Sequence, residues 1–231
     1  MNTVQTLPNG QTIRIQSLTM NDLLAIQSLQ ENVIAALPDT SFLQPLSEEE
    51  FRFILNGNGS MLGAFHEEEL IAFRAMLEPE IDEEHLGRDA GLSENELPSV
   101  LYSEISNVHP AYRGNGLQKM LGKMLMEQVD TSRFRYVCTT VAPFNIASLK
   151  DKFSLGMHII SLKVKYGNLI RYTMMKELTD DPIEVNDLET ILIDMSYLER
   201  QQALLKDGWI GVGMRQEAEE WKVIFKKKRT V

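Results

Sequence analysis

The sequence predicts an α/β (α+β) fold in which a mixed, mostly antiparallel sheet is flanked by helices. Residues 60–66 and 70–77 are two strand-like runs joined across a charged turn, and residues 158–165 and 169–176 are two alternating runs around a short turn; both patterns predict a β-hairpin. Apolar residues at helical spacing follow the first strand, over 21–37, and follow the strand-like run 99–108, over 117–129. With 231 residues, 43% of them hydrophobic, the chain can bury one full α/β core and carry an appended segment.

The amino-terminal part is expected to form one strand and two helices. Residues 11–18 alternate between apolar and polar side chains, as in a half-buried strand. A helix then starts at Thr19 or Asn21, and Ser47 with Glu50 forms a capping-box pattern ahead of a second, shorter helix. The first of these helices ends before Pro38, and its apolar face carries Leu23, Ile26, Leu29, Val33 and Ala36 or Leu37.

The second half continues with a strand, a capped helix and a hairpin. The run 134–141 reads as a strand, and the helix after it is capped by Asn145 and closed by Gly156. Beyond the hairpin, residues 209–214 and 221–226 suggest a final strand pair. Between the two lies an apolar stripe at helical spacing, formed by Leu188, Ile191, Leu192, Met195, Leu198 and Leu205. We expect this stripe to pack on the same core, or else to form a dimer contact or a lid.

The overall charge excludes several classes of partner. A net charge of −10 argues against nucleic acid or an anionic membrane, even though residues 226–229 are basic. It favours cationic acceptors instead. A single cysteine, Cys138, cannot form an intramolecular disulfide, and the first residues show no secretory leader. No apolar run is long enough for a membrane span, so we expect a cytoplasmic protein.

The segment from Asn107 to Gln118 has the layout of an anion-binding cradle. It ends a strand, contains two glycines flanking Asn115, and leads directly into a helix. Gly114 and Gly116 can adopt left-handed backbone conformations that bring successive N–H groups together, and the helix start adds further donors. Glycine pairs of this kind are also common in ordinary turns. The pattern lacks the third glycine of a dinucleotide-binding fingerprint and the Gly-Lys-Ser/Thr of a P-loop.

The same segment resembles motif A of the GNAT N-acetyltransferase family, with Arg113 first, Gly116 fourth and Gln118 last. Gln118 departs from the small residue usual at that position. The helix opened by Asn145 resembles motif B of this family. The resemblance covers about residues 11–178 and implies a GNAT fold that binds acetyl-CoA as cosubstrate without a metal.

The resemblance implies a set of cofactor-binding residues. In the cradle, the backbone amides of residues 114–118 would bind the pyrophosphate. A bulge near the end of the fourth expected strand, 101–108, would separate it from the fifth, 134–141. The amide of Val108 would then polarise the thioester carbonyl. The full set is Ser106, Asn107, Val108, Arg113, Gly114, Asn115, Gly116, Leu117, Gln118, Asn145, Ser148 and Lys152.

Chemistry is expected on the strand 101–108, where the period of two places Tyr102, Glu104, Ser106 and Val108 on one side. An amine must lose its proton before it can attack a thioester, and a part-buried carboxylate such as Glu104 is a suitable base. Alternatively, Glu104 is paired with a cation or faces solvent. His109 precedes Pro110 in a turn and is a poor candidate for the base.

The general acid is less clear. Where many family members have a tyrosine in motif B, this chain has Lys152. Either Tyr102 or Tyr172 serves instead, or the thiolate leaves without a protein acid. We take Glu104 and Tyr102 as the catalytic candidates, and Cys138 as a buried structural residue rather than a covalent relay.

Residues 78–98 are strongly acidic and admit three interpretations. A metal site would need ligand spacing that is absent, because no second histidine and no calcium-loop order is present. A solvated loop or short helix is the simplest interpretation. An acidic lip that attracts cationic acceptors is the third, since a strand order like that of the family would place this loop at the acceptor end.

The sequence therefore indicates two alternative functions. The first is an N-acetyltransferase that moves an acetyl group from acetyl-CoA to a small-molecule or peptide amine by direct attack in a ternary complex. The second is a CoA-binding sensor or interaction module with little or no turnover. We expect residues 1–178 to form the acetyltransferase domain and 179–231 an extension packed on it or at a homodimer contact. The acceptor amine would be recognised near residues 37–46.

Overall fold

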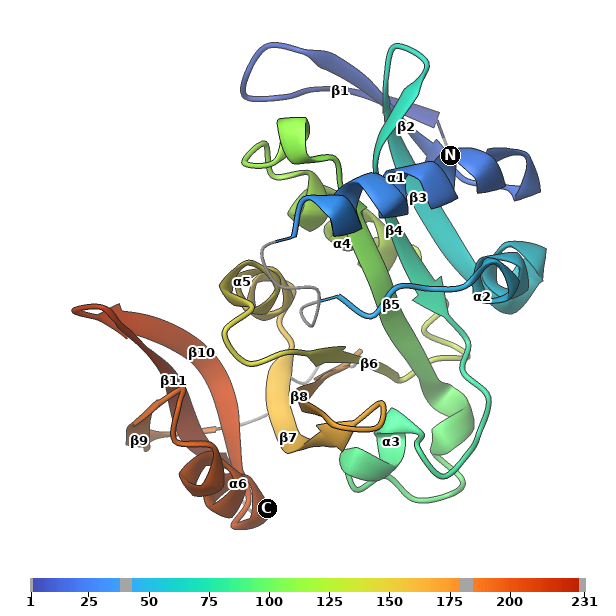
Figure 1. Cartoon of the computed structure of the whole chain (residues 1–231). Helices are drawn as coiled ribbons and strands as arrows, with labels where there is room; N and C mark the ends of the chain where they lie inside the picture. Colours follow the sequence, from blue (N-terminus) through green and yellow to red (C-terminus); the bar gives the residue numbers. More distant parts are fainter. Residues whose placement is uncertain (1, 38–42, 179–184, 229–231) are drawn as a thin grey trace. The chain divides into compact units, whose positions relative to one another are not determined.

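The computed structural model describes residues 2–37, 43–178 and 185–228, and the side chains of 185–188 lie outside this description. The chain divides into two compact units (Figure 1). Unit 1 comprises Met1–Pro79 and Leu101–Asp130, and unit 2 comprises Glu80–Val100 and Thr131–Val231. The expected division into domains 1–178 and 179–231 stays a prediction.

The described residues of unit 1 form five strands that pair antiparallel in sequence order. They are β1 (Asn2–Thr6), β2 (Thr12–Ser17), β3 (Gly59–His66), β4 (Glu69–Leu77) and β5 (Val100–Val108). The predicted hairpin is confirmed as β3 and β4, which meet at a turn where Glu67 has a left-handed φ of 53°. β1 was not expected, because its side chains are mostly exposed and show no apolar alternation.

Three α-helices lie in the described part of unit 1: α1 (Leu23–Ala35), α2 (Glu48–Phe53) and α4 (Leu117–Glu127). Capping boxes start the first two. Thr19 and Asp22 cap the 3₁₀ turn that leads into α1, and Ser47 and Glu50 cap α2 as predicted. A π-helical turn over Ile54–Asn58 ends α2 where Gly57 departs from helical geometry.

The two faces of the unit 1 sheet are covered by different helices. Figure 1 shows α1 in front of the strands and α4 behind them. The core on the α1 side is apolar and includes Phe51 and Phe73, whose rings meet edge to face at 5.9 Å. On the other side, α4 buries Leu117, Leu121 and Leu125 against β3 and β4. The sheet therefore has the cradle helix on one face and, on the other, α1 and α2, which flank the segment expected to recognise the acceptor.

Where the structure describes unit 2, it has six strands, all in antiparallel pairs, in the order β6-β8-β7-β10-β11-β9. They are β6 (Tyr136–Val141), β7 (His158–Lys165), β8 (Leu169–Glu177), β9 (Val185–Asp194), β10 (Trp209–Glu217) and β11 (Glu220–Lys228). Its helices are α3 (Leu86–Asp89), α5 (Ile146–Ser154) and α6 (Leu198–Lys206). The predicted second hairpin and the final strand pair are confirmed as β7–β8 and β10–β11.

The carboxy-terminal segment differs from the expected helix in its first half. Residues 185–194 form strand β9 along β11, and helix begins only at Leu198. α6 then packs against β7 and β10, and β10 extends the sheet from β7. The segment thus adds three strands and a helix to the sheet of unit 2, while a homodimer contact stays a prediction.

Gln201 docks α6 onto this sheet. Its fully buried amide accepts a hydrogen bond from the Tyr172 hydroxyl at 2.7 Å and donates to the Met195 carbonyl at 3.0 Å. We expect Gln201→Ala to lower the free energy of unfolding by about 2 to 3 kcal/mol, because both partners stay buried without this bond. Urea unfolding measures this change in the free energy of unfolding, and Tyr172→Phe, which removes the hydroxyl partner of Gln201, is the matched variant. A loss below about 0.5 kcal/mol would contradict this role.

The acidic segment is ordered by ion pairs within unit 2. The Asp89 carboxylate, 6% exposed, lies 2.8 Å from Lys163 Nζ and 2.9 Å from Lys165 Nζ. Lys165 also bonds to Glu84, and Arg88 pairs with Glu94. Several of the acidic side chains are therefore neutralised, and the segment contains the short helix α3. Among the described residues, no group of three or more His, Cys, Asp or Glu could hold a metal ion.

None of the helices in the described part of the chain has the length and apolar character that a membrane crossing needs.

Candidate functional site

A β-bulge divides β5 and corrects the expected arrangement of its side chains. Arg74 of β4 pairs with Ser106 and Met76 pairs with Ser103, so β5 has one residue more than β4 between these points. Such an extra residue interrupts the strict alternation of side chains. Tyr102 consequently lies opposite Leu77, and these two share the face of the sheet away from Arg74 and Ser106. The expectation that Tyr102, Glu104, Ser106 and Val108 share one side is wrong.

Glu104 lies in the bulge, on the α1 and α2 side. Its neighbour Ile105 is in the apolar core formed with α1 and α2. Glu104 is half-buried, and burial together with the negative charge of Glu50 raises the pKa of its carboxyl to about 7. A carboxyl group with this pKa can exchange a proton near neutral pH, as a general base must. Tyr102, also half-buried, lies two residues before it.

The turn after β5 is held by histidine and tyrosine side chains. The His109 N–H donates to the Ile71 carbonyl at 2.8 Å, and His109 Nδ1 accepts from the Ala111 N–H at 3.3 Å. The Tyr112 hydroxyl lies 2.9 Å from His66 Nδ1. His109 therefore caps the turn, which agrees with the expectation that it is a poor candidate for the catalytic base.

The cradle has the backbone geometry that the sequence predicts. Gly114 and Gly116 have φ angles of 82° and 75°, both left-handed. Asn115 closes the loop by donating from its side chain to the Tyr112 carbonyl at 3.1 Å. Gly116 is the N-cap of α4, and no side chain of the described residues caps the first N–H groups of the helix. These donors are thus free of a side-chain cap and available to an anion.

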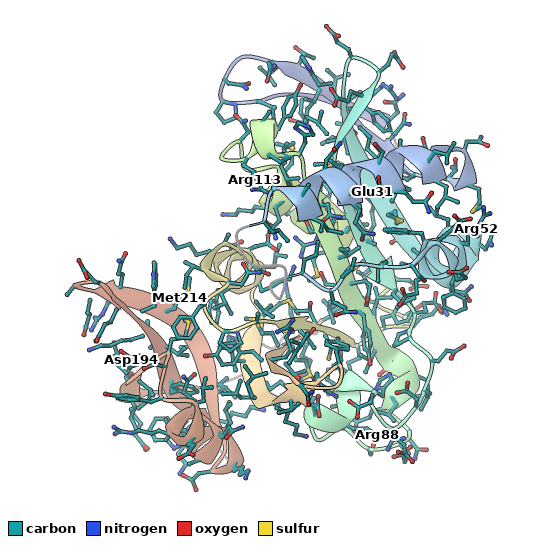
Figure 2. The ribbon with its side chains drawn as sticks, viewed as in Figure 1. Glu31, Arg52, Arg88, Arg113, Asp194 and Met214 are labelled. Atoms are coloured by element: carbon teal, nitrogen blue, oxygen red, sulfur yellow. The ribbon has the colours of Figure 1, made fainter. Side chains whose placement is uncertain are left out.

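The residues around the cradle are mostly accessible. Arg113 is exposed in the loop between β5 and α4, where Figure 2 labels it. Gly114 and Gly116 are exposed as well, whereas Leu117 is buried and anchors the first turn of α4. Gln118 is half-buried.

Gly116→Ala tests the cradle. Within the described structure no atom lies within 4 Å of a Cβ built at Gly116, so the cost is backbone strain of about 1 to 2 kcal/mol. We expect the Kd for acetyl-CoA, measured by calorimetry, to rise by up to about tenfold, because binding must restore the strained turn. Gly208→Ala is the matched control, with a φ of 80° and equally open space in unit 2. Equal weakening of acetyl-CoA binding by both variants would contradict the assignment.

Two adjacent residues of β5 have buried polar side-chain atoms that lack a hydrogen-bond partner in the described part of the chain. Neither amide atom of Asn107, which is 1% exposed, has a hydrogen-bond partner among the described residues. The Ser106 hydroxyl lacks one as well. Because an unsatisfied buried polar group costs about 1 to 3 kcal/mol, such groups suit a strand that binds a polar ligand.

The motif B residues belong to unit 2. Asn145 caps α5 by accepting from the Ser148 N–H at 3.2 Å, as predicted. Lys152 is buried, and its ammonium lies 3.0 Å from Asp151 Oδ2, itself buried. The ammonium is therefore held beside a carboxylate.

The remaining candidate groups of unit 2 are buried. Burial raises the pKa of Tyr172 far above its usual value, and its hydroxyl donates to Gln201. This disfavours Tyr172 as a general acid. Cys138 is free and buried, and burial with the charge of Asp89 raises the pKa of its thiol to about 12. It is thus unreactive, in agreement with a structural role.

Arg74 is the residue beside the cradle that the sequence interpretation missed. Its side chain is fully buried and reaches the first turn of α4. The signal was a lone charge in the otherwise apolar strand 70–77. His66 was also missed, since its contact with Tyr112 joins residues 46 positions apart.

Solved structures similar to this chain carry the GNAT fold. The GNAT domain of S. lividans PAT has a TM-score of 0.55 and 20% identity, covering 77% of this chain and 97% of that domain. A GNAT-family acetyltransferase from Streptococcus pneumoniae has a TM-score of 0.55 at 17% identity, covering 72% and 99%. Arabidopsis thaliana NAA60 in complex with acetyl-CoA has a TM-score of 0.55 at 16% identity, covering 72% and 98%.

No protein-family profile matches the sequence, and no curated protein matches it either. The likeness in structure nevertheless extends over about three quarters of the chain and nearly all of each similar domain. It agrees with the strand and helix order of both units and with the glycine cradle ahead of α4. The chain therefore has the GNAT acetyltransferase fold, which confirms the predicted fold class.

Proposed function

We propose that this chain is an N-acetyltransferase that transfers the acetyl group of acetyl-CoA to an amine by direct attack in a ternary complex. The observation that supports this most is the cradle at residues 113–118, with left-handed Gly114 and Gly116 at the uncapped start of α4. The fold supports it too, since one of the similar structures is in complex with acetyl-CoA.

The chain offers suitable groups to hold acetyl-CoA. In the proposal, the N–H groups of residues 114–118 bind the diphosphate, helped by the exposed Arg113. The buried, unpartnered side chains of Ser106 and Asn107, with the backbone of Val108, bind the pantetheine and its thioester. Asn145, Ser148 and Lys152 of unit 2 stay predictions from the family resemblance. Acetyl-CoA supplies the activated acyl group.

Glu104 removes the proton from the attacking amine. With a pKa of about 7, its carboxylate is a large fraction of the group at neutral pH and is basic enough to accept this proton. In this proposal, Tyr102 assists on the same strand or protonates the leaving thiolate. Transfer of this proton from the amine to Glu104 makes the amine nucleophilic.

The acceptor is proposed to be a small-molecule or peptide amine. The net charge of −10 favours a cationic acceptor. Residues 38–42, within the segment expected to read the acceptor, lie outside the described residues. A cytoplasmic location and a homodimer are part of the same proposal.

A second function, a CoA-binding sensor without turnover, is favoured by one observation. Lys152, which stands where the family usually has a tyrosine, is held by Asp151. Thiol release from acetyl-CoA, followed with a chromogenic thiol reagent against a panel of amines and amine-ended peptides, separates the two functions. Amine-dependent release with an acetylated product supports the transferase. Saturable acetyl-CoA binding without release for any class of amine supports the sensor.

A further inference from the structure

Arg74 is a buried charge in the middle of β4. The strand runs from Glu69 to Leu77, and its other central residues are apolar and buried. Arg74 itself is fully buried and is among the largest such side chains of the described structure. Because removing an ion from water costs several kcal/mol, a buried arginine in a strand calls for a specific role.

The guanidinium joins the sheet to the first turn of the cradle helix. One terminal nitrogen of Arg74 donates to Ser103 Oγ at 3.0 Å, and the other donates to the Gln118 carbonyl at 3.1 Å. Gln118 is the second residue of α4, directly after the glycine loop. Arg74 therefore fixes the position of the helical turn whose N–H groups form the cradle. All three residues belong to unit 1.

The sign of the charge matters at this place. The N-terminus of a helix carries a partial positive charge, so a cation beside it is unfavourable by itself and anions are preferred there. An arginine under the first turn of α4 adds its field to that of the helix, and an anion in the cradle benefits from both. Because Arg74 is shielded from water, salt screens its charge less than that of an exposed lysine.

We propose that Arg74 is a positioning residue for the diphosphate of CoA: it clamps the first turn of α4 and adds a buried positive charge beneath the cradle without touching the ligand. This inference rests on the proposed function, since it presumes that the cradle binds CoA. It goes further by naming a residue of β4, outside the ligand-binding set that the sequence predicts.

Calorimetric titration of wild type, Arg74→Met and Arg74→Lys tests the proposal with two ligands. CoA contains the diphosphate and pantetheine lacks it. We expect Arg74→Met to raise the Kd for CoA by about tenfold or more, because both charge and clamp are lost. Arg74→Lys should raise it only about threefold, because lysine keeps the charge but not the two-point contact. Both variants should bind pantetheine as the wild type does.

Three results would overturn the proposal. The first is a Kd for CoA that is the same in Arg74→Met and wild type. The second is an Arg74→Met variant in which the Kd for pantetheine rises as much as the Kd for CoA. The third is an equal rise of the Kd for CoA in Arg74→Lys and Arg74→Met. Should Arg74→Met not fold, Arg74→Lys and Ser103→Ala decide, since each loosens the clamp and keeps the charge. A Kd for CoA unchanged in both would then overturn the clamp. A wild type that binds no CoA would instead refute the proposed function.

Discussion

Replacing Glu104 with glutamine should make the protein more stable at about pH 8 and, in the same variant, lower kcat by about a hundredfold. The stability gain is expected to reach up to about 3 kcal/mol, because the folded state holds the pKa near 7 against an ordinary value of 4.5. Urea unfolding at several pH values measures the gain without any knowledge of the acceptor.

The pH dependence has a defined sign. Below about pH 4.5 the carboxyl is protonated in both the folded and the unfolded state, so wild type and Glu104→Gln should be equally stable. Between 4.5 and about 7 the unfolded state ionises first, and the wild type loses stability as the pH rises. Above about 7 the difference is constant. The reaction needs the ionised Glu104 carboxylate, so kcat of the wild type should rise with pH and level off above about 7.

Glu50→Gln is the matched control for Glu104. Glutamine keeps the capping box of α2 but removes the charge that helps to raise the pKa of Glu104. The pH profiles of stability and kcat should both move to lower pH. A Glu104→Gln variant no more stable than the wild type at about pH 8 would contradict the raised pKa, and an unchanged kcat would remove Glu104 from the mechanism.

Replacing Asp89 with asparagine should lower the free energy of unfolding by about 3 kcal/mol at neutral pH. The substitution leaves the buried ammonium of Lys165 beside a neutral amide and weakens the hydrogen bond from the Thr173 hydroxyl, 3.1 Å from Asp89 Oδ2. Differential scanning calorimetry gives the change. Glu94→Gln is the control, because Glu94 pairs with Arg88 in the same segment but is 69% exposed, and its loss should barely move the melting temperature.

The contribution of Asp89 should also disappear in acid. Burial alone would raise the pKa of Asp89, but hydrogen bonds from Lys163 and Lys165 prevail and hold it below the ordinary value of 3.8. The stabilisation is therefore present above about pH 4 and is lost as the pH falls through the lower pKa of the folded state. Equal stability of Asp89→Asn and wild type at neutral pH would contradict the structural role of the pair.

The parts of the fold that sequence predicts well are those that neighbouring residues decide. The Ser47–Glu50 and Asn145–Ser148 caps each close between residues three positions apart, so the pattern contains both partners. The left-handed conformations of Gly114 and Gly116 follow from local chemistry in the same way. The cradle and its helix could therefore be predicted before the structure was known.

Features that depend on distant strands could not be predicted. Residues 185–194 have apolar side chains at helical spacing, yet β11 offers its edge and they form β9 instead. The bulge at Glu104 arises from pairing with β4, and the alternation of the sequence continues through it without a signal. The contact of Arg74 with Gln118 joins residues 44 positions apart. Tertiary contacts override local pattern in each case.

The central claim, that the cradle at residues 113–118 binds acetyl-CoA, is tested most directly by the melting temperature of the wild type with and without excess acetyl-CoA. A ligand at about 100 times its Kd adds about 2.7 kcal/mol of stability, so a clear upward shift is predicted. Gly116→Ala should need more acetyl-CoA for the same shift. An unchanged melting temperature at millimolar acetyl-CoA would contradict both the transferase and the sensor.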